Sequence, residues 1–250
     1  MKRIAVVIGA SGGIGGACVE HCCADANYVS VIAVSRSNAA LSFSENSKLT
    51  ILEADSSKPS MANVVTEVLM QAKRVASLDV DIIIATGLLH TETGSIKVQP
   101  EKRIEALDMQ SALTVLETNT LMPMLWLQAF SPLFALKLDT RVLVLSARVG
   151  SIGDNRLGGW YSYRSSKAAL NMMLKTASTE YARRYPNVKL IAYHPGTTDT
   201  GLSKPFQANV PEGKLFSQDY SAERLIDVMQ SQAIDKTLSF VDWQGKSIEW

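Results

Sequence analysis

The stretch IAVVIGASGGIG, residues 4–15, decides the fold class of this 250-residue chain. Its first five residues are apolar and mostly β-branched, without the polar alternation expected of a strand that has one face in water. Glycines follow at positions 9, 12, 13 and 15, and glycine allows a tight turn at low steric cost. The pattern predicts a strand covered on both faces over 4–8, then a glycine-rich turn, then a helix over about 13–25.

Short apolar runs alternate with longer helical stretches along the rest of the chain. We predict further strands over 29–34, 49–52, 81–85, 142–145 and 188–193, with a weaker one over 237–241. The helical stretches between them are about 60–75, 100–137 (two helices), 162–184 and 220–232. Such alternation is typical of βαβ units, whose right-handed crossovers favour a doubly wound sheet. We therefore expect an α/β fold, a single Rossmann domain over 1–250, with about seven mostly parallel strands and helices on both faces.

Composition and charge argue against several classes of protein. The 25 basic and 24 acidic side chains give a net charge of +1, so no strong field attracts nucleic acid or an anionic membrane. The three cysteines, at 18, 22 and 23, fit neither a disulfide framework nor a metal site, and we expect no metal. The apolar run over 121–136 is shorter than the roughly 20 residues that span a bilayer. Glycines interrupt the apolar start of the chain, so it does not read as an export signal, and we expect a cytoplasmic protein.

The glycine-rich turn is a candidate anion site. Gly9, Gly13 and Gly15 have the spacing G-x3-G-x-G between a predicted strand and a predicted helix. Backbone N–H groups and the dipole at a helix start favour the pyrophosphate of a dinucleotide. We take Gly9, Ser11, Gly13, Ile14 and Gly15 as candidate cofactor contacts, and the alternative is a glycine-rich turn that holds no ligand.

The end of the second predicted strand indicates which dinucleotide is preferred. Sites for NAD usually carry an acidic residue there, which binds the adenine ribose. This chain has Ser35 followed by Arg36, and a guanidinium can pair with a 2′-phosphate. We therefore expect NADP(H) over NAD(H), the alternative being that Arg36 is a solvated surface residue. Asp55 either accepts a hydrogen bond from the adenine or caps a turn with Ser56 and Ser57.

Tyr163 and Lys167 form the candidate catalytic pair. Their spacing of four residues places them on one face of the helix predicted over 162–184. A free phenol, with a pKa of about 10, is a poor acid or base at neutral pH. A neighbouring ammonium lowers the pKa of a phenol, but a shift of about three units requires ~4 kcal/mol. We therefore expect a bound nicotinamide or a helix dipole to contribute to that shift.

The glycine turn and the tyrosine–lysine pair together resemble the short-chain dehydrogenase/reductase family, along the whole chain. The runs RVGSI (148–152) and GGWYSY (158–163), with HPG at 194–196, are similar to its C-factor subgroup and to the sniffer-type carbonyl reductases. The resemblance implies that Tyr163 gives a proton to a substrate carbonyl oxygen while NADPH delivers hydride to the carbon. It also implies that Lys167 orients the nicotinamide ribose.

The same resemblance assigns further residues to the site. Asn119 falls where the family has an asparagine that holds a water in a proton relay. The cofactor contacts implied by the resemblance are Gly87, Lys167, Pro195, Gly196, Thr198 and Thr200.

Two positions depart from the family pattern. The usual serine after the fifth family strand is Ala147 here. Ser146 is our candidate to polarise the carbonyl, although a regular strand would point it to the opposite face, and Ser151 or no serine are the alternatives. The usual Asn-Ala-Gly after the preceding strand is Ala85-Thr86-Gly87, which keeps the glycine and loses one amide.

The leading interpretation is an enzyme, an NADPH-dependent oxidoreductase that reduces an aldehyde, ketone or quinone. It would act on a small-molecule carbonyl or alcohol. The alternative, favoured by the C-factor resemblance and by Ala147, is an NADP(H)-binding signalling or sensor protein with vestigial turnover. A third interpretation, a nucleotide-binding module without redox chemistry, does not account for Tyr163 and Lys167 together.

Two expectations concern larger features. The segment over 201–218 follows the cofactor loop and is expected to cover the substrate, with Leu202, Phe206 and Trp160 as an apolar pocket wall. The helix expected over 119–136 is apolar nearly all round, with Trp126, Phe130 and Phe134. Because such a helix must be buried, we expect a partner subunit to cover one side of it, in a homodimer or homotetramer.

Overall fold

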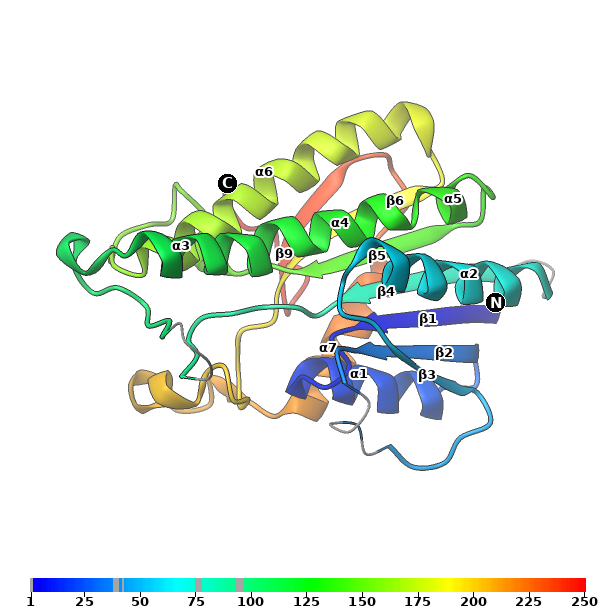
Figure 1. Cartoon of the computed structure of the whole chain (residues 1–250), viewed down its shortest axis with the longest axis horizontal. Helices are drawn as coiled ribbons and strands as arrows, with labels where there is room; N and C mark the ends of the chain where they lie inside the picture. Colours follow the sequence, from blue (N-terminus) through cyan, green and yellow to red (C-terminus); the bar gives the residue numbers. More distant parts are fainter. Residues whose placement is uncertain (1, 38–40, 42, 75–77, 93–96) are drawn as a thin grey trace.

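A seven-stranded sheet forms the centre of the computed structural model, which describes residues 2–37, 41, 43–74, 78–92 and 97–250 (Figure 1). Its strand order is β3-β2-β1-β4-β5-β6-β9, and every neighbouring pair is parallel. The order reverses beside β1, which opens a crevice at the carboxyl ends of the central strands. The strands are β1 (Lys2–Ile8), β2 (Tyr28–Ser35), β3 (Leu49–Glu53), β4 (Leu78–Ile84), β5 (Thr140–Leu145), β6 (Val188–His194) and β9 (Leu238–Asp242). The predicted doubly wound α/β fold is confirmed.

Helices cover both faces of the sheet. Helices α1 (Gly13–Ala24) and α7 (Gln218–Ser231) lie on one face, and α2 (Lys58–Arg74), α4 (Met122–Ala129) and α6 (Tyr161–Arg184) lie on the other (Figure 1). Alternate residues of β1 enter the two cores: Ile4, Val6 and Ile8 face α2 and α4, whereas Ala5 and Val7 face α1. Both faces of β1 are therefore apolar, which explains the run without polar alternation. The helix predicted over 60–75 begins two residues earlier, at Lys58, and is described as far as Arg74, because residue 75 lies outside the described residues.

The helical stretch predicted over 100–137 is divided into several short elements. A single 3-10 turn, η2 (Ile104–Ala106), precedes α3 (Met109–Leu116), and a π-helical turn, η3 (Glu117–Leu121), joins α3 to α4. Helix α4 ends at Ala129 and α5 (Ser131–Phe134) follows. Pro132 has no N–H to donate and restricts the residue before it, so it ends the continuous helix.

The aromatic side chains of this region are buried by the chain itself. Trp126, Phe130 and Phe134 each have no exposed surface, and they pack in the core that α2, α4 and α6 form over the sheet. These three side chains form the side of the helix that the core covers, and the partner subunit expected on the other side stays a prediction.

The carboxyl edge of the sheet carries several small elements. They are η4 (Arg148–Gly150), η5 (Lys204–Asn209) and a two-stranded parallel ribbon of β7 (Thr197–Thr198) and β8 (Leu215–Phe216). In Figure 1 the gold segment that contains η5 projects from the sheet at this edge, away from the end where the N-terminus lies. These elements surround the candidate site.

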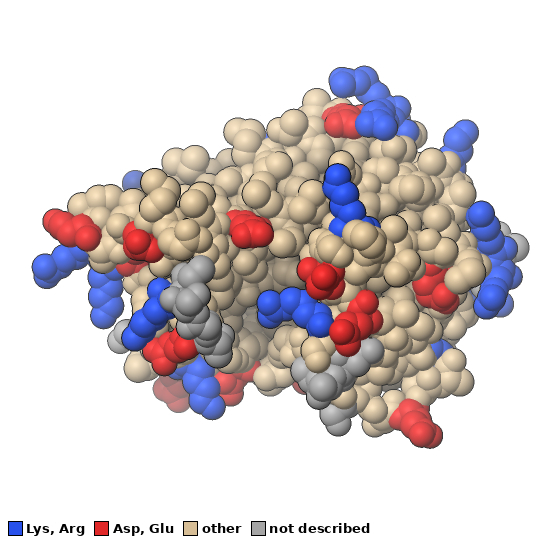
Figure 2. All heavy atoms as spheres, in the orientation of Figure 1, with Lys and Arg blue, Asp and Glu red and all other residues tan. Residues whose placement is uncertain are grey.

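The charges on the surface agree with the net charge of +1 that the sequence gives. On the face shown in Figure 2, basic and acidic side chains are interspersed. No helix in the described ranges is long and apolar enough to cross a membrane. Cys18, Cys22 and Cys23 are free thiols, and the described residues contain no cluster of three metal-ligating side chains.

Candidate active site

A cavity of about 230 Å³ lies beyond the carboxyl ends of β5 and β6. The residues predicted from the sequence that line it are Ile14, Ser146, Tyr163, Pro195, Gly196, Thr198 and Thr200. The cavity is also lined by residues that were not assigned to the catalytic or cofactor site: Leu89, Ala147, Val149, Trp160, His194, Thr197, Leu202, Ser203, Phe206 and Val210. The structure therefore brings the candidate proton donor, Tyr163, together with the segment after β6 that the resemblance assigned to the cofactor.

The glycine turn lies beside this cavity and has the geometry of an anion site. Gly9 has a φ of +88°, and a Cβ there would lie 2.8 Å from the carbonyl oxygen of Ala85. A Cβ on Gly15 would collide with the carbonyl oxygen of Gly9, so α1 approaches the turn as closely as backbone allows. Helix α1 begins at Gly13 with no side-chain cap. Its first N–H groups therefore remain to bind a pyrophosphate, and the residues present fit a dinucleotide.

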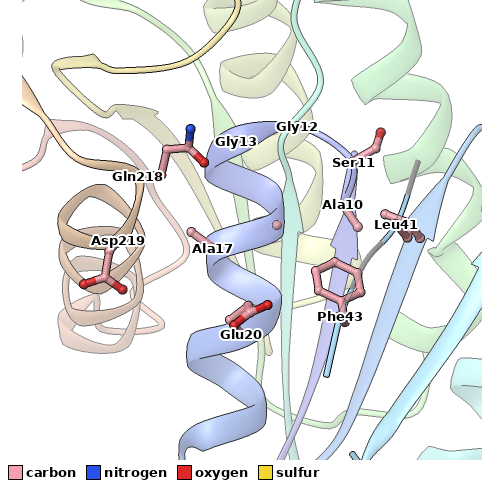
Figure 3. Close-up of a pocket in the computed structure, with 11 residues that line it drawn as sticks. Ala10, Ser11, Gly12, Gly13, Ala17, Glu20, Leu41, Phe43, Gln218 and Asp219 are labelled. Carbon is pink, nitrogen blue, oxygen red and sulfur yellow. The ribbon is translucent and has the colours of Figure 1, made fainter. Parts of the chain in front are cut away.

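A second hollow, of about 440 Å³, lies against the outer side of the turn (Figure 3). Ser11 and Gly13 line it, together with the carboxylates of Glu20 from α1 and Asp219 from α7. The Gln218 side chain lies against Gly13, where an added Cβ would come within 2.8 Å of its Cδ. Because two carboxylates repel a phosphate, the pyrophosphate fits better on the side of the turn that faces the smaller cavity.

The end of β2 carries no acidic side chain. The hydroxyl of Ser35 donates to the backbone carbonyl two residues further on, and Arg36 is exposed. After β3, Asp55 accepts hydrogen bonds at Oδ1 from the N–H of Ser57 at 2.9 Å and from the hydroxyl of Ser60 at 2.6 Å. These bonds lower the pKa of Asp55 to about 2. Of the two alternatives for Asp55, the structure shows the turn-capping contacts, and the adenine contact stays a prediction.

Tyr163 and Lys167 face the sheet from the first two turns of α6. The ammonium nitrogen of Lys167 lies 5.9 Å from the centre of the Tyr163 ring and donates to the carbonyl oxygen of Leu145 at 2.8 Å. Burial lowers the pKa of Lys167 to about 7 and raises that of Tyr163 to about 12. The sequence led us to expect a lowered phenol pKa. Desolvation has the larger effect here because it disfavours the charged form of both groups and weakens the cation that would stabilise the phenolate.

Asn119 lies in the π-helical turn η3 and connects two parts of the site. Its Oδ1 accepts from the N–H of Leu88 at 2.7 Å, and its Nδ2 donates to the carbonyl oxygen of Leu88 and to the hydroxyl of Ser166 at 2.8 and 3.0 Å. The hydroxyl of Ser166 in turn donates to the carbonyl oxygen of Tyr163 at 2.8 Å. Asn119 thereby fixes the loop after β4 to the turn of α6 that holds the candidate catalytic pair. Ser166 was not foreseen, although its place directly before Lys167 is a usable signal.

The serines near β5 are both engaged elsewhere. The hydroxyl of Ser146 donates to Oδ1 of Asn171 at 2.7 Å, and Asn171 is eight residues beyond Tyr163, about 12 Å along the helix axis. The hydroxyl of Ser151 accepts from the N–H of Asp154 at 3.1 Å, and Ser151 does not line the cavity. Ala147 lies in the cavity wall at the position where the family has a hydroxyl. A serine that contacts the substrate stays a prediction, and the contacts observed favour none.

The segment after β6 is fixed tightly against its neighbours. Gly196 has a φ of +76°, and a Cβ there would lie 2.9 Å from Cδ2 of Phe216. The hydroxyl of Thr198 lies 2.7 Å from that of Ser221 on α7, and Thr200 places its methyl group against Gly13 of the glycine turn. This segment therefore links α1 to the cavity. Gly87 is exposed and does not line the cavity.

His194 ends β6 in the cavity wall. Burial and, less strongly, the nearby Arg148 guanidinium lower the pKa of His194 to about 4, so the imidazole is neutral at pH 7. Its ring meets that of Trp243 edge-on, with centroids 5.7 Å apart. The side chain is packed against Trp243 and also borders the site.

Aromatic rings from two segments form one side of the cavity: Trp160 and Tyr163 at the start of α6, and Phe206 of η5. Phe206 of η5 meets Trp160 at 5.2 Å and His90 at 5.7 Å between ring centroids, and Trp160 meets Tyr163 at 6.1 Å. Trp160 has a φ of 53° and a ψ of 44°, a left-handed conformation that costs about 1–2 kcal/mol for a residue with a Cβ. The expected apolar wall of Leu202, Phe206 and Trp160 is confirmed.

Comparison with known proteins assigns the family. Residues 3–211 match the family model for the short chain dehydrogenases. The chain belongs to the short-chain dehydrogenase family. This agrees with the glycine turn and with the tyrosine–lysine pair at the cavity.

Curated relatives of this chain include a dehydrogenase, a reductase and the C-signal protein. It is 31% identical over 147 residues to the 1-hydroxy-2-glutathionyl-2-methyl-3-butene dehydrogenase of Rhodococcus sp., covering 59% of this chain and 62% of the relative. It is 28% identical over 159 residues to the (S)-benzoin-forming benzil reductase of Bacillus cereus, covering 58% and 63%. The C-signal protein of Myxococcus xanthus is 29% identical over 147 residues, covering 59% and 81%. The matches thus span slightly less than two thirds of the first two relatives.

Solved structures confirm the fold of the chain. The carbonyl reductase Sniffer of D. melanogaster superimposes with a TM-score of 0.79 at 19% identity, over 100% of this chain and 99% of that one. The NADPH-bound carbonyl reductase from chicken fatty liver also gives a TM-score of 0.79, at 24% identity, over 100% and 94%.

Proposed function

We propose that this short-chain dehydrogenase is an NADP(H)-dependent reductase of an aldehyde, ketone or quinone. One observation carries the proposal: Tyr163 lines the same cavity as the segment over 194–200, with Lys167 one helical turn behind it. The uncapped start of α1 beside this cavity supports a dinucleotide. The fold likeness to carbonyl reductases, one of them bound to NADPH, supports the reaction class.

The side chains suggest how the proton moves. In the proposed reaction, bound NADPH supplies the hydride that reaches the carbonyl carbon. Tyr163 donates its phenolic proton to the carbonyl oxygen, and its pKa of about 12 keeps it protonated at neutral pH. The ammonium of Lys167 stabilises the phenolate that remains until a proton returns from solvent. Asn119 forms hydrogen bonds with Leu88 and Ser166 and so orders the backbone beside Tyr163. We expect a water along this backbone to relay the returning proton.

A pH dependence follows from the lowered pKa of Lys167. The side chain is charged below a pKa of about 7 and neutral above it, and only the charged form stabilises the phenolate. We therefore expect kcat for carbonyl reduction, at saturating NADPH and substrate, to fall as the pH rises through about 7. Lys167→Met, which has no charge, should be slow and independent of pH over the same range. A wild-type profile that stays flat across this range in steady-state assays would contradict the assignment.

The function itself is tested by following NADPH absorbance with a panel of aldehydes, ketones and quinones. We expect the wild-type protein to oxidise NADPH only when a carbonyl compound of the panel is present. A protein that binds NADPH and oxidises it with no member of the panel would support the alternative, a sensor or signalling protein. That alternative is favoured by the likeness to the C-signal protein and by Ala147 in the cavity wall.

The preference for NADP(H) over NAD(H) is part of the proposal and rests on Arg36. Replacing Arg36 with alanine should weaken NADPH binding by about 1.5–3 kcal/mol, the usual range for a hydrogen bond to a charged group, and leave NADH binding unchanged. Fluorescence titration with each nucleotide measures both affinities. Arg74→Ala removes an exposed charge at the carboxyl end of α2, far from this site, and is the control. Equal weakening of both nucleotides, or wild-type binding of NADH as tight as NADPH, would argue against the preference.

The segment over 201–218 is proposed to open for ligands. The cavity of about 230 Å³ is smaller than the roughly 300–1,000 Å³ of most ligand pockets, too small for a nicotinamide and a substrate together. Phe206 closes it against Trp160 and His90, and the ring nitrogen Nε2 of His90 lies 3.1 Å from the carbonyl oxygen of Gly201. We infer that these contacts separate when the cofactor and the carbonyl compound enter.

The assembly, location and domain organisation also remain proposals. Exposed apolar side chains on α3 and α6, among them Leu113 and Met172 at 51% and 67% exposure, support a homodimer or homotetramer. The free cysteines support a reducing compartment such as the cytoplasm. One sheet that draws strands from residues 2 to 242 supports a single domain over 1–250.

A further inference from the structure

The start of α6 is held by a side chain from a distant segment. Glu101 lies 61 residues before Ser162 and is only 5% exposed. Its Oε2 accepts the backbone N–H of Ser162 at 3.1 Å, and its Oε1 accepts the hydroxyl of the same serine. The backbone carbonyl oxygen of Glu101 also accepts the N–H of Trp160. One residue thus satisfies three donors at the beginning of the helix that carries Tyr163 and Lys167.

Helix α6 cannot supply this cap itself. Its N-cap residue is Trp160, which makes no side-chain capping bond, and an indole has no acceptor to offer. The N–H of Ser162 is among the first four of the helix, which have no partner within it. A carboxylate at this place also interacts favourably with the positive end of the helix dipole. Glu101 therefore does what a serine or aspartate at the N-cap does elsewhere.

The same segment supports an unusual stretch of backbone. Gly158, Gly159 and Trp160 have φ values of 65°, 66° and 53°, so three consecutive residues are left-handed. A Cβ on Gly159 would lie 3.4 Å from the carbonyl oxygen of Glu101, which shows how closely the two segments pack. A left-handed tryptophan persists only where its surroundings hold it, and here Glu101 accepts its N–H.

We propose that Glu101 is a positioning residue that sets Tyr163 and Trp160 in the cavity. Tyr163 directly follows Ser162, so a displacement of the helix start moves the phenol, and Trp160 on the other side forms part of the aromatic wall. The proposal rests on the proposed function, because the group that is positioned is the proton donor of that reaction.

The test compares Glu101→Ala and Glu101→Gln with Glu105→Ala. Glu105 is exposed in η2 of the same segment and provides the matched control for a lost carboxylate. For each protein we would measure kcat, KM for NADPH, the melting temperature, and amide hydrogen exchange in peptides that cover residues 158–166.

Glu101→Ala should lower kcat by about 10- to 100-fold, as expected for a reacting group displaced by up to about 1 Å, with KM for NADPH nearly unchanged. Amide exchange over 161–165 should become faster, while exchange in β1 and α7 stays at the wild-type rate. Glu101→Gln should recover part of kcat, since its amide oxygen still accepts one of the two side-chain bonds. Glu105→Ala should behave as the wild type.

Three outcomes would overturn the proposal: unchanged exchange over 161–165 in Glu101→Ala, a kcat equal to that of the wild type despite faster exchange, or faster exchange throughout the molecule with NADPH binding lost. The last outcome would mean that Glu101 serves only stability. If the wild type reduces no carbonyl compound, the proposed function fails separately, while the exchange data still decide whether Glu101 caps α6.

Discussion

Replacing Tyr163 with phenylalanine is expected to lower the rate of NADPH-dependent carbonyl reduction by about 10²–10⁴-fold, the usual contribution of a general acid. The variant loses only the hydroxyl. Its ring can keep the edge-on contact with Trp160, whose centroid lies 6.1 Å away, and it remains in the cavity wall. Tyr163 provides the only phenol among the described residues that line the cavity. No other side chain there can take over as a phenolic proton donor.

Stopped-flow absorbance separates this loss of chemistry from a loss of binding. NADPH affinity should be unchanged in Tyr163→Phe, because the phenol is not needed to hold the nucleotide. Tyr161→Phe is the matched control: Tyr161 lies two residues earlier on α6, is 37% exposed and does not line the cavity. It should retain the wild-type rate. A Tyr163→Phe variant that reduces the substrate nearly as fast as the wild type would remove the phenol from the mechanism.

The sheet was largely predictable because most of its strands are short apolar runs, and β4 shows where that pattern fails. We expected this strand over 81–85, whereas it begins at Leu78. Asp79 and Asp81 lie within it, and both pair with Arg3 of β1, at 3.3 and 2.9 Å. In a sequence, an acidic residue indicates a position exposed to solvent. Only the contacts with Arg3 on the neighbouring strand show that Asp79 and Asp81 are buried and paired.

The candidate site was likewise predictable only in part. The pair of Tyr163 and Lys167 follows from local helical spacing, and so does their common face. Glu101 could not be found, because nothing near it in the sequence shows that it meets Ser162 across 61 residues. The direction of the pKa shift of Tyr163 also depends on the fold, since burial, which the sequence does not show, raises it.

Ser146 and Ala147 show how far strand periodicity can be taken. Alternation predicts that neighbouring side chains at the end of β5 point to opposite faces. In the structure both residues line the cavity, although the hydroxyl of Ser146 donates to Asn171 on α6. Both lie beyond Leu145, where β5 ends, so strand alternation does not separate them.

The glycine turn provides the second large effect, through Gly15→Ala. An ideal Cβ on Gly15 would overlap the carbonyl oxygen of Gly9 and lie 3.0 Å from its carbonyl carbon. Both atoms belong to the backbone, so no side chain can rotate away, and α1 must move from the turn. We expect the free energy of unfolding to fall by at least the ~1–3 kcal/mol typical of overpacking. NADPH binding should be lost with it, because the N–H groups at the start of α1 would no longer converge on the pyrophosphate.

Thermal unfolding and NADPH titration measure the two consequences, and Gly201→Ala is the control. A Cβ on Gly201 meets nothing within 4 Å, and its φ is not positive, so this variant should unfold at the wild-type temperature. The two losses in Gly15→Ala need not be equal. A variant that is destabilised yet binds NADPH as tightly as the wild type would show that the nucleotide lies elsewhere. A variant that melts normally but does not bind would show that α1 can move without cost, and that the close approach of Gly15 to Gly9 serves the nucleotide alone.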